Sequence, residues 1–369
     1  MRTPTDRTPT RRHDASASDS LEHLRGTPDA ASAERPAAAP HPIGLAVMLT
    51  LAVSLVMAAF LWPTVASEPK DIPIVAAGQG SEQITDRLAE HSDGRFDVST
   101  AQDRGDAVDL LERREAYGAI VVSPDPQTGV PAPEVLVASA ASPAVAQSLR
   151  QVAPTLKQQL QADLEKKAAA AGAPAPTVEV PVTDVTPLSD DDPTGAGLAA
   201  AGFPLVLGGM LGGVGIAKAV RGTGRRIAAL TAYVTLAGVA IGLIMQSWFG
   251  ILQGELWQTM LAAGLAVAAV SLPIAGLTAL LGTLGLGLGA ATFMLFANPI
   301  SSSSMPTQFL PAPWGAVGQA FPPGASAHLL RSLSYFPEAA TGTQWWTLAL
   351  WAVSGLALLL LDGLRGRRG

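Results

Sequence analysis

The chain has 369 residues, of which 48% are hydrophobic and only 15% are charged, with a formal net charge of −6. So few charges are unusual for a soluble protein, and from Leu256 to Leu330 there is no Asp, Glu, Lys or Arg at all, which predicts that this stretch lies in or on a bilayer. The absence of cysteine excludes disulfides, thiolate metal sites and a cysteine nucleophile.

The chain begins with a polar segment followed by an apolar one. Residues 1–41 are rich in Ala, Pro, Ser, Thr and Arg and have hardly any apolar periodicity, so we expect a disordered cytoplasmic tail. Ile43 to Ala66 carries no charge and exceeds the roughly 20 residues that one crossing needs. A cleaved signal peptide is the competing interpretation, but the long leader favours an uncleaved anchor. We assign transmembrane helix 1 to residues 42–66.

Residues 67–195 alternate short apolar strands with amphipathic helices, which predicts a small α/β domain. The predicted helices are "SEQITDRLAEH", "DAVDLLERREA" and the run from Pro143 to Ala171. The predicted strands are "IPIVAAG", "RFDVSTA", "YGAIVVSPD", "EVLVASA" and "TVEVPVTDV". In the second helix, Leu110 and Leu111 should face the sheet, opposite Glu112 and Glu115. The segment is acidic, with ten Lys and Arg against twenty-one Asp and Glu.

Two short motifs in this segment have competing interpretations. "GQGSEQ", which begins at Gly78, follows a strand as a phosphate-binding loop would, but Gln83 stands where the dinucleotide pattern needs a third glycine. A plain strand-to-helix turn is therefore favoured. "SDDDP", Ser189 to Pro193, has carboxylates that suit a divalent cation. The alternative is a solvated acidic collar that caps the next helix. No two histidines have ligand spacing, so we expect no metal and no cofactor.

Residues 196–364 are predicted to form a bundle of five further transmembrane helices. The predicted spans are Gly197 to Ala217, Ile227 to Gln246, Leu256 to Ala275, Leu277 to Ala297 and Trp345 to Leu361. By the positive-inside rule, the cationic loop after the first of these spans and the tail 365–369 with Arg365, Arg367 and Arg368 face the cytoplasm. The loop is the candidate cytoplasmic coupling loop: Lys218, Arg221, Arg225 and Arg226.

These two cytoplasmic positions decide the number of crossings. An even number of spans must separate them, so the stretch from Leu256 to Ala297 is expected to cross twice, through a very tight uncharged turn. The prediction is a polytopic α-helical membrane protein with six transmembrane helices, both termini in the cytoplasm, and the α/β domain of residues 67–195 outside, between helices 1 and 2. The acidity of that domain does not oppose its translocation.

Glycines within the predicted spans have the spacing of helix-packing motifs. Small residues four apart allow two helix backbones to approach closely. In most proteins such motifs pack the helices of one bundle, and homodimerisation is the alternative. The candidate packing glycines are Gly208, Gly209, Gly212, Gly213, Gly285 and Gly289.

The stretch "NPISSSSMPTQFLPAPWG", residues 298–315, is neutral and rich in proline, which breaks regular helix. Non-helical backbone at membrane depth must be buried against protein or line a wet cavity. We therefore expect a re-entrant or interfacial segment over 298–343 that caps the external mouth of the bundle; the alternative is a neutral loop on the headgroups. The following "ASAHLLRSLSYF" places Leu329, Leu333 and Phe336 on one face, as in an interfacial helix. The candidate cap residues are Asn298, Pro299, Ser301, Pro306, Pro311 and Pro313.

From Ile43 to its end, the chain resembles the type-2 ABC exporter permeases, and within them the phage-infection-protein (YhgE/Pip-like) branch of bacterial membrane proteins. The layout of one span, an external α/β domain and five more spans with a neutral re-entrant element is similar. So are two local elements, "YGAIVVSPD" and "NPISSSSMP". The resemblance implies a dimer of six-span halves whose loop between the second and third spans contacts a separate ATPase. Because that loop is short and no amphipathic helix precedes the first span, the phage-infection branch fits better.

Several classes of function can be compared on the sequence. No Walker motif occurs, so ATP hydrolysis would need another chain, and no ionisable residue lies within a predicted span to couple transport to an ion gradient. We expect a cell-membrane permease that exports a hydrophobic or amphipathic substrate. Its expected partners are the lipid bilayer, a second copy of the chain and a possible ATPase, with no nucleic acid. The alternative is an envelope receptor or scaffold whose external domain binds a ligand, a wall component or a phage.

An enzyme is the third reading of the sequence and the least favoured. Ser301 to Ser304 resemble a set of nucleophiles, but the one nearby base is His328 and nothing in the sequence orients it. Intramembrane proteolysis would also need a GxSG or HExxH arrangement, and neither occurs. We therefore expect no catalytic residue in this chain.

Overall fold

The computed structural model describes residues 42–82, 85–86, 94–124, 131–172, 174–175 and 177–365. The chain divides into two compact units, Met1–Ala52 and Val53–Gly369. The described part of the first unit is the beginning of helix α1 (Pro42–Val65). The tail expected over residues 1–41 lies outside the described residues, and so do Arg367 and Arg368.

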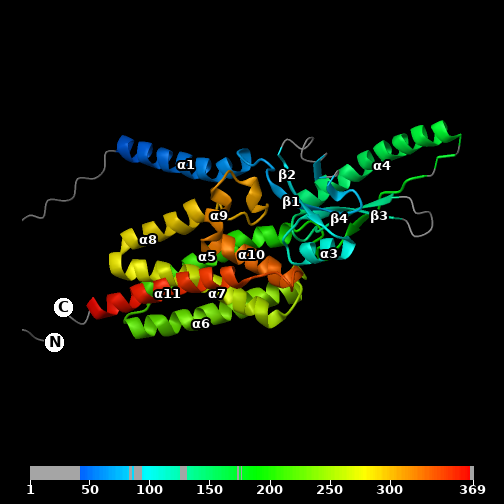
Figure 1. Cartoon of the computed structure of the whole chain (residues 1–369). Coiled ribbons are helices and arrows are strands. Elements are labelled where there is room, and N and C mark those ends of the chain that lie inside the picture. Colours follow the sequence, from blue (N-terminus) through cyan, green and yellow to red (C-terminus); the bar gives the residue numbers. More distant parts are fainter. Residues whose placement is uncertain are drawn as a thin grey trace, which may run out of the picture. The chain divides into compact units, whose positions relative to one another are not determined.

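Five helices in the described ranges are long and apolar enough to cross a membrane (Figure 1). They are α1, α5 (Ala196–Ala219), α6 (Thr223–Gly242) with its π-helical continuation η1 (Leu243–Trp248), α7 (Leu256–Leu281) and α11 (Gly342–Arg365). The shortest has 24 residues. At about 1.5 Å per residue such a helix spans roughly 36 Å, more than the ~30 Å of a bilayer's hydrocarbon core. The chain is therefore a mostly helical, multi-pass membrane protein.

The stretch from Leu256 to Ala297 folds into one long helix and one short one. The turn lies at Gly282, which has a φ of 62°, and not near Gly276, where the sequence predicted it. Gly276 lies inside α7, where it packs against Leu358 of α11. The second helix, α8 (Thr283–Ala290) with the π-helical η2 (Ala291–Ala297), folds back along α7. Its 15 residues give roughly 22 Å, so this segment is shorter than a full crossing requires.

Helix α7 is the centre of the bundle, because 72% of its most apolar stretch is buried, against 28% for α5 and 22% for α11. Two glycines of α5 show why the helices approach so closely. A Cβ on Gly209 would lie 2.8 Å from Val270 of α7, and one on Gly213 would lie 2.6 Å from the Ser271 carbonyl oxygen. Any larger residue at these positions would force the two helices apart.

The other candidate packing glycines also have contacts inside the chain. Gly208 and Gly212 lie against Tyr233 of α6, whose hydroxyl donates a 2.7 Å hydrogen bond to the Gly208 carbonyl. Gly285 and Gly289 of α8 lie against Leu277 and Ile274 of α7. These glycine faces are thus occupied by neighbouring helices of the same bundle.

A five-stranded sheet forms from residues 72–184, in the order β2-β1-β3-β4-β5. All neighbouring strands are parallel except β3 and β4. The strands are β1 (Ile72–Gly78), β2 (Phe96–Ala101), β3 (Gly118–Pro124), β4 (Pro131–Val137) and β5 (Val182–Asp184). In the described part of this domain two helices cover the sheet, α3 (Arg104–Glu112) and α4 (Pro143–Ala171), and most of the predicted helix "SEQITDRLAEH" lies outside the described residues. We call residues 67–195 the α/β domain.

The two helices pack on opposite faces of the sheet, because successive side chains of a strand point to opposite sides. Val75 of β1 packs with Leu111 of α3 in one cluster, whereas Ile74 packs with Leu149 of α4 in the other. Leu111 is fully buried, as the sequence predicted, and Leu110 is partly buried beside it.

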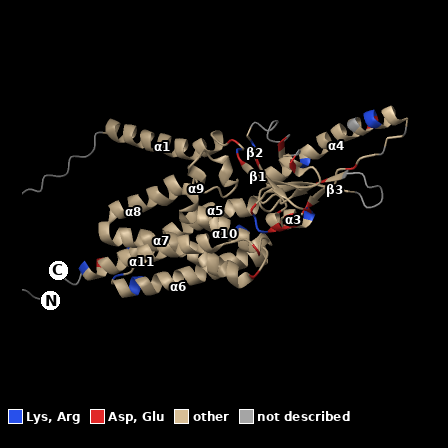
Figure 2. Ribbon diagram, in the orientation of Figure 1, with Lys and Arg blue, Asp and Glu red and all other residues tan. Residues whose placement is uncertain are grey.

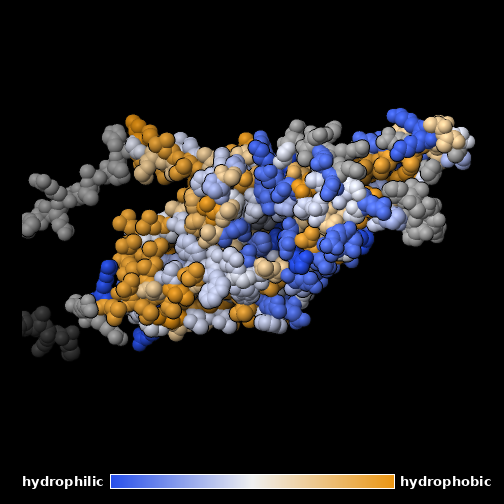
Figure 3. Space-filling model, viewed as in Figure 1, coloured by the Kyte–Doolittle hydropathy of each residue, from blue (hydrophilic) through white to orange (hydrophobic). Residues whose placement is uncertain are grey.

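Charged residues are unevenly distributed over the protein. Figure 2 shows Lys, Arg, Asp and Glu concentrated on the α/β domain and at the ends of α6 and α11, with hardly any charge along the helices between. Figure 3 shows hydrophobic side chains over α8 and α11 and hydrophilic ones over the α/β domain. This distribution is what an apolar bilayer solvent selects.

Candidate functional site

The segment that connects η2 to α11, residues 298–341, is the most irregular part of the apolar half of the chain. It contains a 3₁₀ turn, η3 (Thr307–Phe309), a short helix, α9 (Trp314–Gln319), and α10 (Pro322–Tyr335). Two prolines begin α10, where their missing N–H groups would have no helical partner anyway. We call residues 298–341 the connecting segment.

The candidate cap residues fall into a buried and an exposed set. Ser301 and Pro306 are buried, and Asn298 and Pro299 are half-buried at the end of η2. Pro311 and Pro313 are exposed. The backbone between them is non-helical apart from η3, as the prolines predicted.

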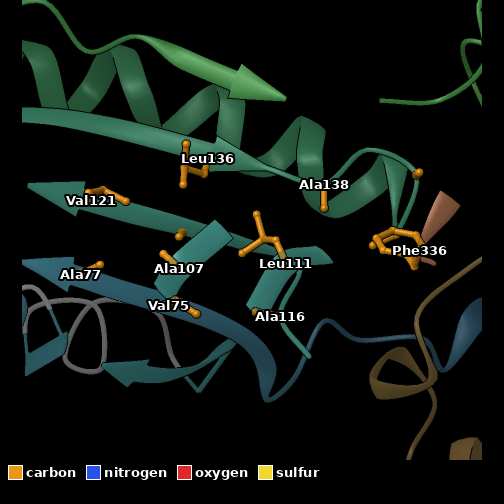
Figure 4. Packing of buried hydrophobic residues seen from close by; sticks show 12 residues of the cluster. Val75, Ala77, Ala107, Leu111, Ala116, Val121, Leu136, Ala138 and Phe336 are labelled. Atoms are coloured by element: carbon orange, nitrogen blue, oxygen red, sulfur yellow. The ribbon is translucent and has the colours of Figure 1, made fainter. Parts of the chain in front are cut away.

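Helix α10 is buried in the protein, so its prediction as an interfacial helix was wrong. Leu329 is fully buried in a cluster with Leu198 of α5 and Ala262 of α7. Phe336, directly after α10, is 1% exposed and belongs to the core of the α/β domain, where it packs in the cluster that contains Leu111 (Figure 4). The apolar face that suggested contact with lipid instead joins the helix bundle to the α/β domain.

Polar contacts reinforce this junction. The Tyr335 hydroxyl donates a 2.6 Å hydrogen bond to the Ile251 carbonyl and accepts a 3.4 Å bond from the Ser189 backbone N–H. The Gln253 N–H donates to Ser334 Oγ at 2.6 Å. Residues from the α/β domain, from the η1–α7 loop and from α10 therefore meet at one place.

Two arginines lie at the same junction. Arg331 of α10 is 6% exposed and donates from Nη1 to the Ala140 carbonyl at 2.9 Å and from Nη2 to the Ser303 carbonyl at 3.3 Å. Arg114, which follows α3, donates from Nη1 to the His328 carbonyl at 3.2 Å and to Ser332 Oγ at 2.8 Å. The Arg114 guanidinium also lies 5.6 Å from the centroid of the Phe336 ring.

Neither guanidinium has a carboxylate within ion-pair distance among the residues that the structure describes. Burial lowers the pKa of Arg114 to about 10, and repulsion from Arg331 adds to this. Burial also lowers the pKa of Arg331. Burial, and after it the positive charges of Arg114 and Arg331, lowers the pKa of His328 to about 3. The site is therefore cationic and His328 is neutral at pH 7.

These side chains surround a small cavity of about 40 Å³, to which the connecting segment contributes Ser302, Ser303 and Ser304. Arg114, His328 and Arg331 line it from the α/β domain and α10. We call it the arginine cavity. Its volume corresponds to roughly three waters, at about 10–15 Å³ each.

Two larger cavities adjoin the arginine cavity across the connecting segment. One, of about 150 Å³, shares Ser302 to Met305 with it and is otherwise lined by Phe60, Pro63 and Thr64 of α1, among others. The other, of about 600 Å³, shares Thr307 and Gln319 and extends to Glu68 and Lys70. The connecting segment thus forms a wall of all three cavities.

The arrangement does not resemble a hydrolytic site, although it brings His328 near the serines that the sequence suggested as nucleophiles. No hydrogen bond joins His328 to a serine side chain in the described part of the chain. An imidazole with a pKa of about 3 is also a weak base at neutral pH.

The other sequence motifs lie elsewhere. In the loop between α5 and α6, Lys218, Arg221 and Arg225 are exposed. Arg226 is partly buried, and it donates to the Val220 carbonyl at 2.8 Å and pairs with Asp362 of α11 at 3.1 Å. Three of the four candidate coupling residues are thus exposed, and the fourth holds α6 against the end of α11.

The acidic triplet acts as a helix cap. Asp192 is buried, and its two carboxylate oxygens accept hydrogen bonds from the backbone N–H groups of Gly197 and Leu198, in the first turn of α5. Such a cap stabilises the helix by satisfying N–H groups that lack helical partners. Over the described ranges, no group of three or more His, Asp or Glu has the arrangement of a metal site.

The sequence did not single out Arg114 and Arg331. Arg331 is the first charged residue after the uncharged stretch that ends at Leu330, and such an isolated arginine is a signal that sequence reading can use. No comparable signal marks Arg114, which stands in the charged run "ERRE".

Comparison with known proteins gives no family for the chain. No protein-family model matches it, and neither a curated protein nor a solved structure does.

Proposed function

We propose that this chain is a permease-like protein of a bacterial cell membrane that exports a hydrophobic or amphipathic substrate, in the manner of a type-2 ABC permease. The observation that carries the proposal is the junction at α10. A domain that merely stands on an anchor needs one helix, whereas this α/β domain is joined to the middle of a bundle through Phe336, Tyr335 and Arg331. In this proposal, a rearrangement on one side of the junction is transmitted to the other through these contacts.

In this proposal the chain crosses the membrane six times. The 15 residues of α8 and η2 cover most of the fifth crossing beside α7, and the first residues of the connecting segment complete it. Both termini lie in the cytoplasm and the α/β domain lies outside. The cationic loop between α5 and α6 and the near absence of charge along the helices support this orientation. The connecting segment then closes the external end of the bundle.

Two exposed surfaces support the proposed ATPase partner and the proposed homodimer. Lys218, Arg221 and Arg225 offer an exposed basic face to an acidic groove of a separate ATPase. Because the α5 and α8 glycines pack within the chain, a homodimer would use another surface. α11 is one such surface, with Trp346 and Leu350 strongly exposed.

A receptor or scaffold is the second candidate, and helix α4 favours it. Its first half covers the sheet, but its second half extends beyond the sheet and is largely exposed (Figure 1). Such a helix is suited to contact a wall component, another protein or a phage.

The proposal can be tested with a reversible disulfide that fixes the connecting segment to the chain after α1. The Glu68 N–H donates a 3.1 Å hydrogen bond to the Phe309 carbonyl, so these backbones are adjacent. The natural chain has no cysteine that could form a competing disulfide. Glu68→Cys with Phe309→Cys, oxidised to a disulfide, should stop efflux of lipophilic dyes from cells or proteoliposomes, and reduction should restore it. The single variant Glu68→Cys is the control.

Two results would count against the proposal. The first is wild-type protein that neither changes the efflux of any hydrophobic compound nor stimulates a co-purified ATPase. The second is a fully oxidised double variant that transports as well as the control. Tight ligand binding that survives in both states would favour the receptor.

A further inference from the structure

We propose that the arginine cavity is a binding site for a phosphate group, held by Arg114, Arg331 and the serines of the connecting segment. This inference goes beyond transport, because the site can bind its ligand whether or not the chain moves a cargo.

The first argument is the number of unused donors. Each guanidinium has five N–H donors in a planar fork. Two hydrogen bonds are found for each arginine in the described part of the chain, and all four go to neutral oxygens. Among the described residues, three donors on each group are thus without a partner, and both side chains line the cavity. Two such forks suit an oxyanion, which accepts several charge-assisted hydrogen bonds at once.

The second argument is the uncompensated charge. A buried cation is expensive unless an anion or many hydrogen bonds accompany it. The carboxylate whose charge acts on Arg331 is that of Asp192, but the two groups are not within ion-pair distance, and the Asp192 oxygens accept hydrogen bonds from the first turn of α5. The lowered pKa of both arginines has the same cause, since their positive charges are buried together. An anion in the cavity would neutralise them.

Neutral groups in the cavity wall also lack partners. Ser302 Oγ is buried and has no hydrogen-bond partner within the described ranges, although buried hydroxyl groups nearly always have one. Gln319 contributes a buried acceptor, Oε1, which likewise has no hydrogen-bond partner in the described part of the chain. A donor and an acceptor beside two cations suit a singly protonated phosphate or its ester better than a halide ion.

The surroundings allow two sources for the phosphate. The cavity has room for a group the size of a few waters, which fits inorganic phosphate. It also shares Ser302 to Met305 with the neighbouring cavity that is lined by Phe60 and Pro63. A phospholipid could therefore place its headgroup phosphate on the arginines and its apolar part beside α1.

The test uses the purified full-length protein in phosphate-free detergent micelles, followed by isothermal titration calorimetry. The probes are inorganic phosphate, the short-chain lipid dihexanoyl phosphatidic acid, and dihexanoyl phosphatidylcholine as a zwitterionic lipid. We expect saturable binding of at least one of the first two. Saturable binding of inorganic phosphate identifies a free anion as a sufficient ligand, and binding of phosphatidic acid alone identifies a lipid headgroup. Absence of saturable binding for both overturns the proposal.

Substitutions then locate the site. Arg331→Gln should weaken binding about tenfold or more, the scale of a lost charge-assisted hydrogen bond. The matched control is Arg150→Gln, which removes an exposed arginine of the α/β domain whose charge is already paired with Asp184 at 2.8 Å. Equal affinity in the Arg331→Gln variant and the wild type would overturn the proposal.

Arg331 also donates to two backbone carbonyls, so its substitution perturbs the fold as well as the site. A second variant keeps the test decisive. Ser302→Ala removes a hydroxyl that has no partner among the residues that the structure describes, and it leaves the arginine hydrogen bonds given above in place. It should preserve the thermal transition without ligand and weaken binding by roughly threefold to tenfold, the scale of a neutral hydrogen bond. Unchanged affinity in Ser302→Ala, when Arg331→Gln does not fold, would also overturn the proposal.

Discussion

Phe336 offers the sharpest test of the junction between the α/β domain and the helix bundle. Its ring is 1% exposed in the core of the α/β domain although it directly follows α10. An aromatic side chain buries roughly 150–250 Å², which at about 25 cal/mol per Å² amounts to roughly 4–6 kcal/mol. Measured Phe→Ala costs of about 3–5 kcal/mol are consistent with this. We therefore expect Phe336→Ala to destabilise the junction by about 4 kcal/mol, including the lost Arg114 contact.

The assay is amide hydrogen exchange of the protein in micelles. If the junction opens as a local unit, a cost of about 4 kcal/mol raises the exchange rates of α10 and the adjoining α/β domain by about three orders of magnitude, at about 1.4 kcal/mol per tenfold. Phe249→Ala is the matched control, because that ring is 53% exposed, and it should change exchange by less than tenfold. Equal effects of the two variants would refute the view that α10 is held by the α/β domain.

Three further predictions concern pH, topology and packing. The pKa of His328 is lowered to about 3 from a usual 6.5, so its contribution to stability is complete above pH 6.5 and is lost as the pH falls toward 3. Between pH 6.5 and 5 the free energy of unfolding should fall by about 2 kcal/mol because of this group. In thermal unfolding, the stability of His328→Gln should therefore depend less on pH than that of the wild type. Parallel pH profiles would contradict the lowered pKa of His328. In the cysteine-free chain, a membrane-impermeant maleimide should label Glu165→Cys in intact cells and Arg221→Cys only after lysis, and the reverse pattern would overturn the proposed orientation. Gly213→Ala should lower the stability measured by thermal unfolding by about 1–3 kcal/mol, because its Cβ would lie 2.6 Å from the Ser271 carbonyl oxygen. Gly215→Ala is the control and should cost little, because its Cβ would meet nothing within 4 Å. Similar values for both variants would show that the α5–α7 contact is looser than described.

Local patterns in the sequence were sufficient for most of the secondary structure. The helix predicted from Pro143 to Ala171 has those bounds in the structure, because Ser142 caps its start and Gly172 adopts the left-handed conformation at its end. The apolar strands and Leu111 are also where period-two and helical patterns predicted them. These signals depend on neighbours within one or two turns, which is why they can be read from the chain.

Non-local contacts explain what the sequence did not predict. The turn after α7 moved from Gly276 to Gly282 because packing against α11 keeps Gly276 inside the helix. The burial of Phe336, directly after α10, depends on a core formed more than two hundred residues earlier in the chain, around Leu111. For the same reason, Arg114 and Arg331 gave no joint signal in the sequence, although they line one cavity.

The central position of α7 has a consequence for the biogenesis of the protein. α5 and α6 are synthesised before α7, so the glycine faces that pack against α7 in the folded protein are exposed to lipid until α7 is inserted. α11, which packs on the other side of α7 through Gly355, emerges only after the whole of residues 298–341. A nascent chain truncated before Leu256 should therefore be inserted but unassembled, and exposed to membrane quality control until α7 arrives.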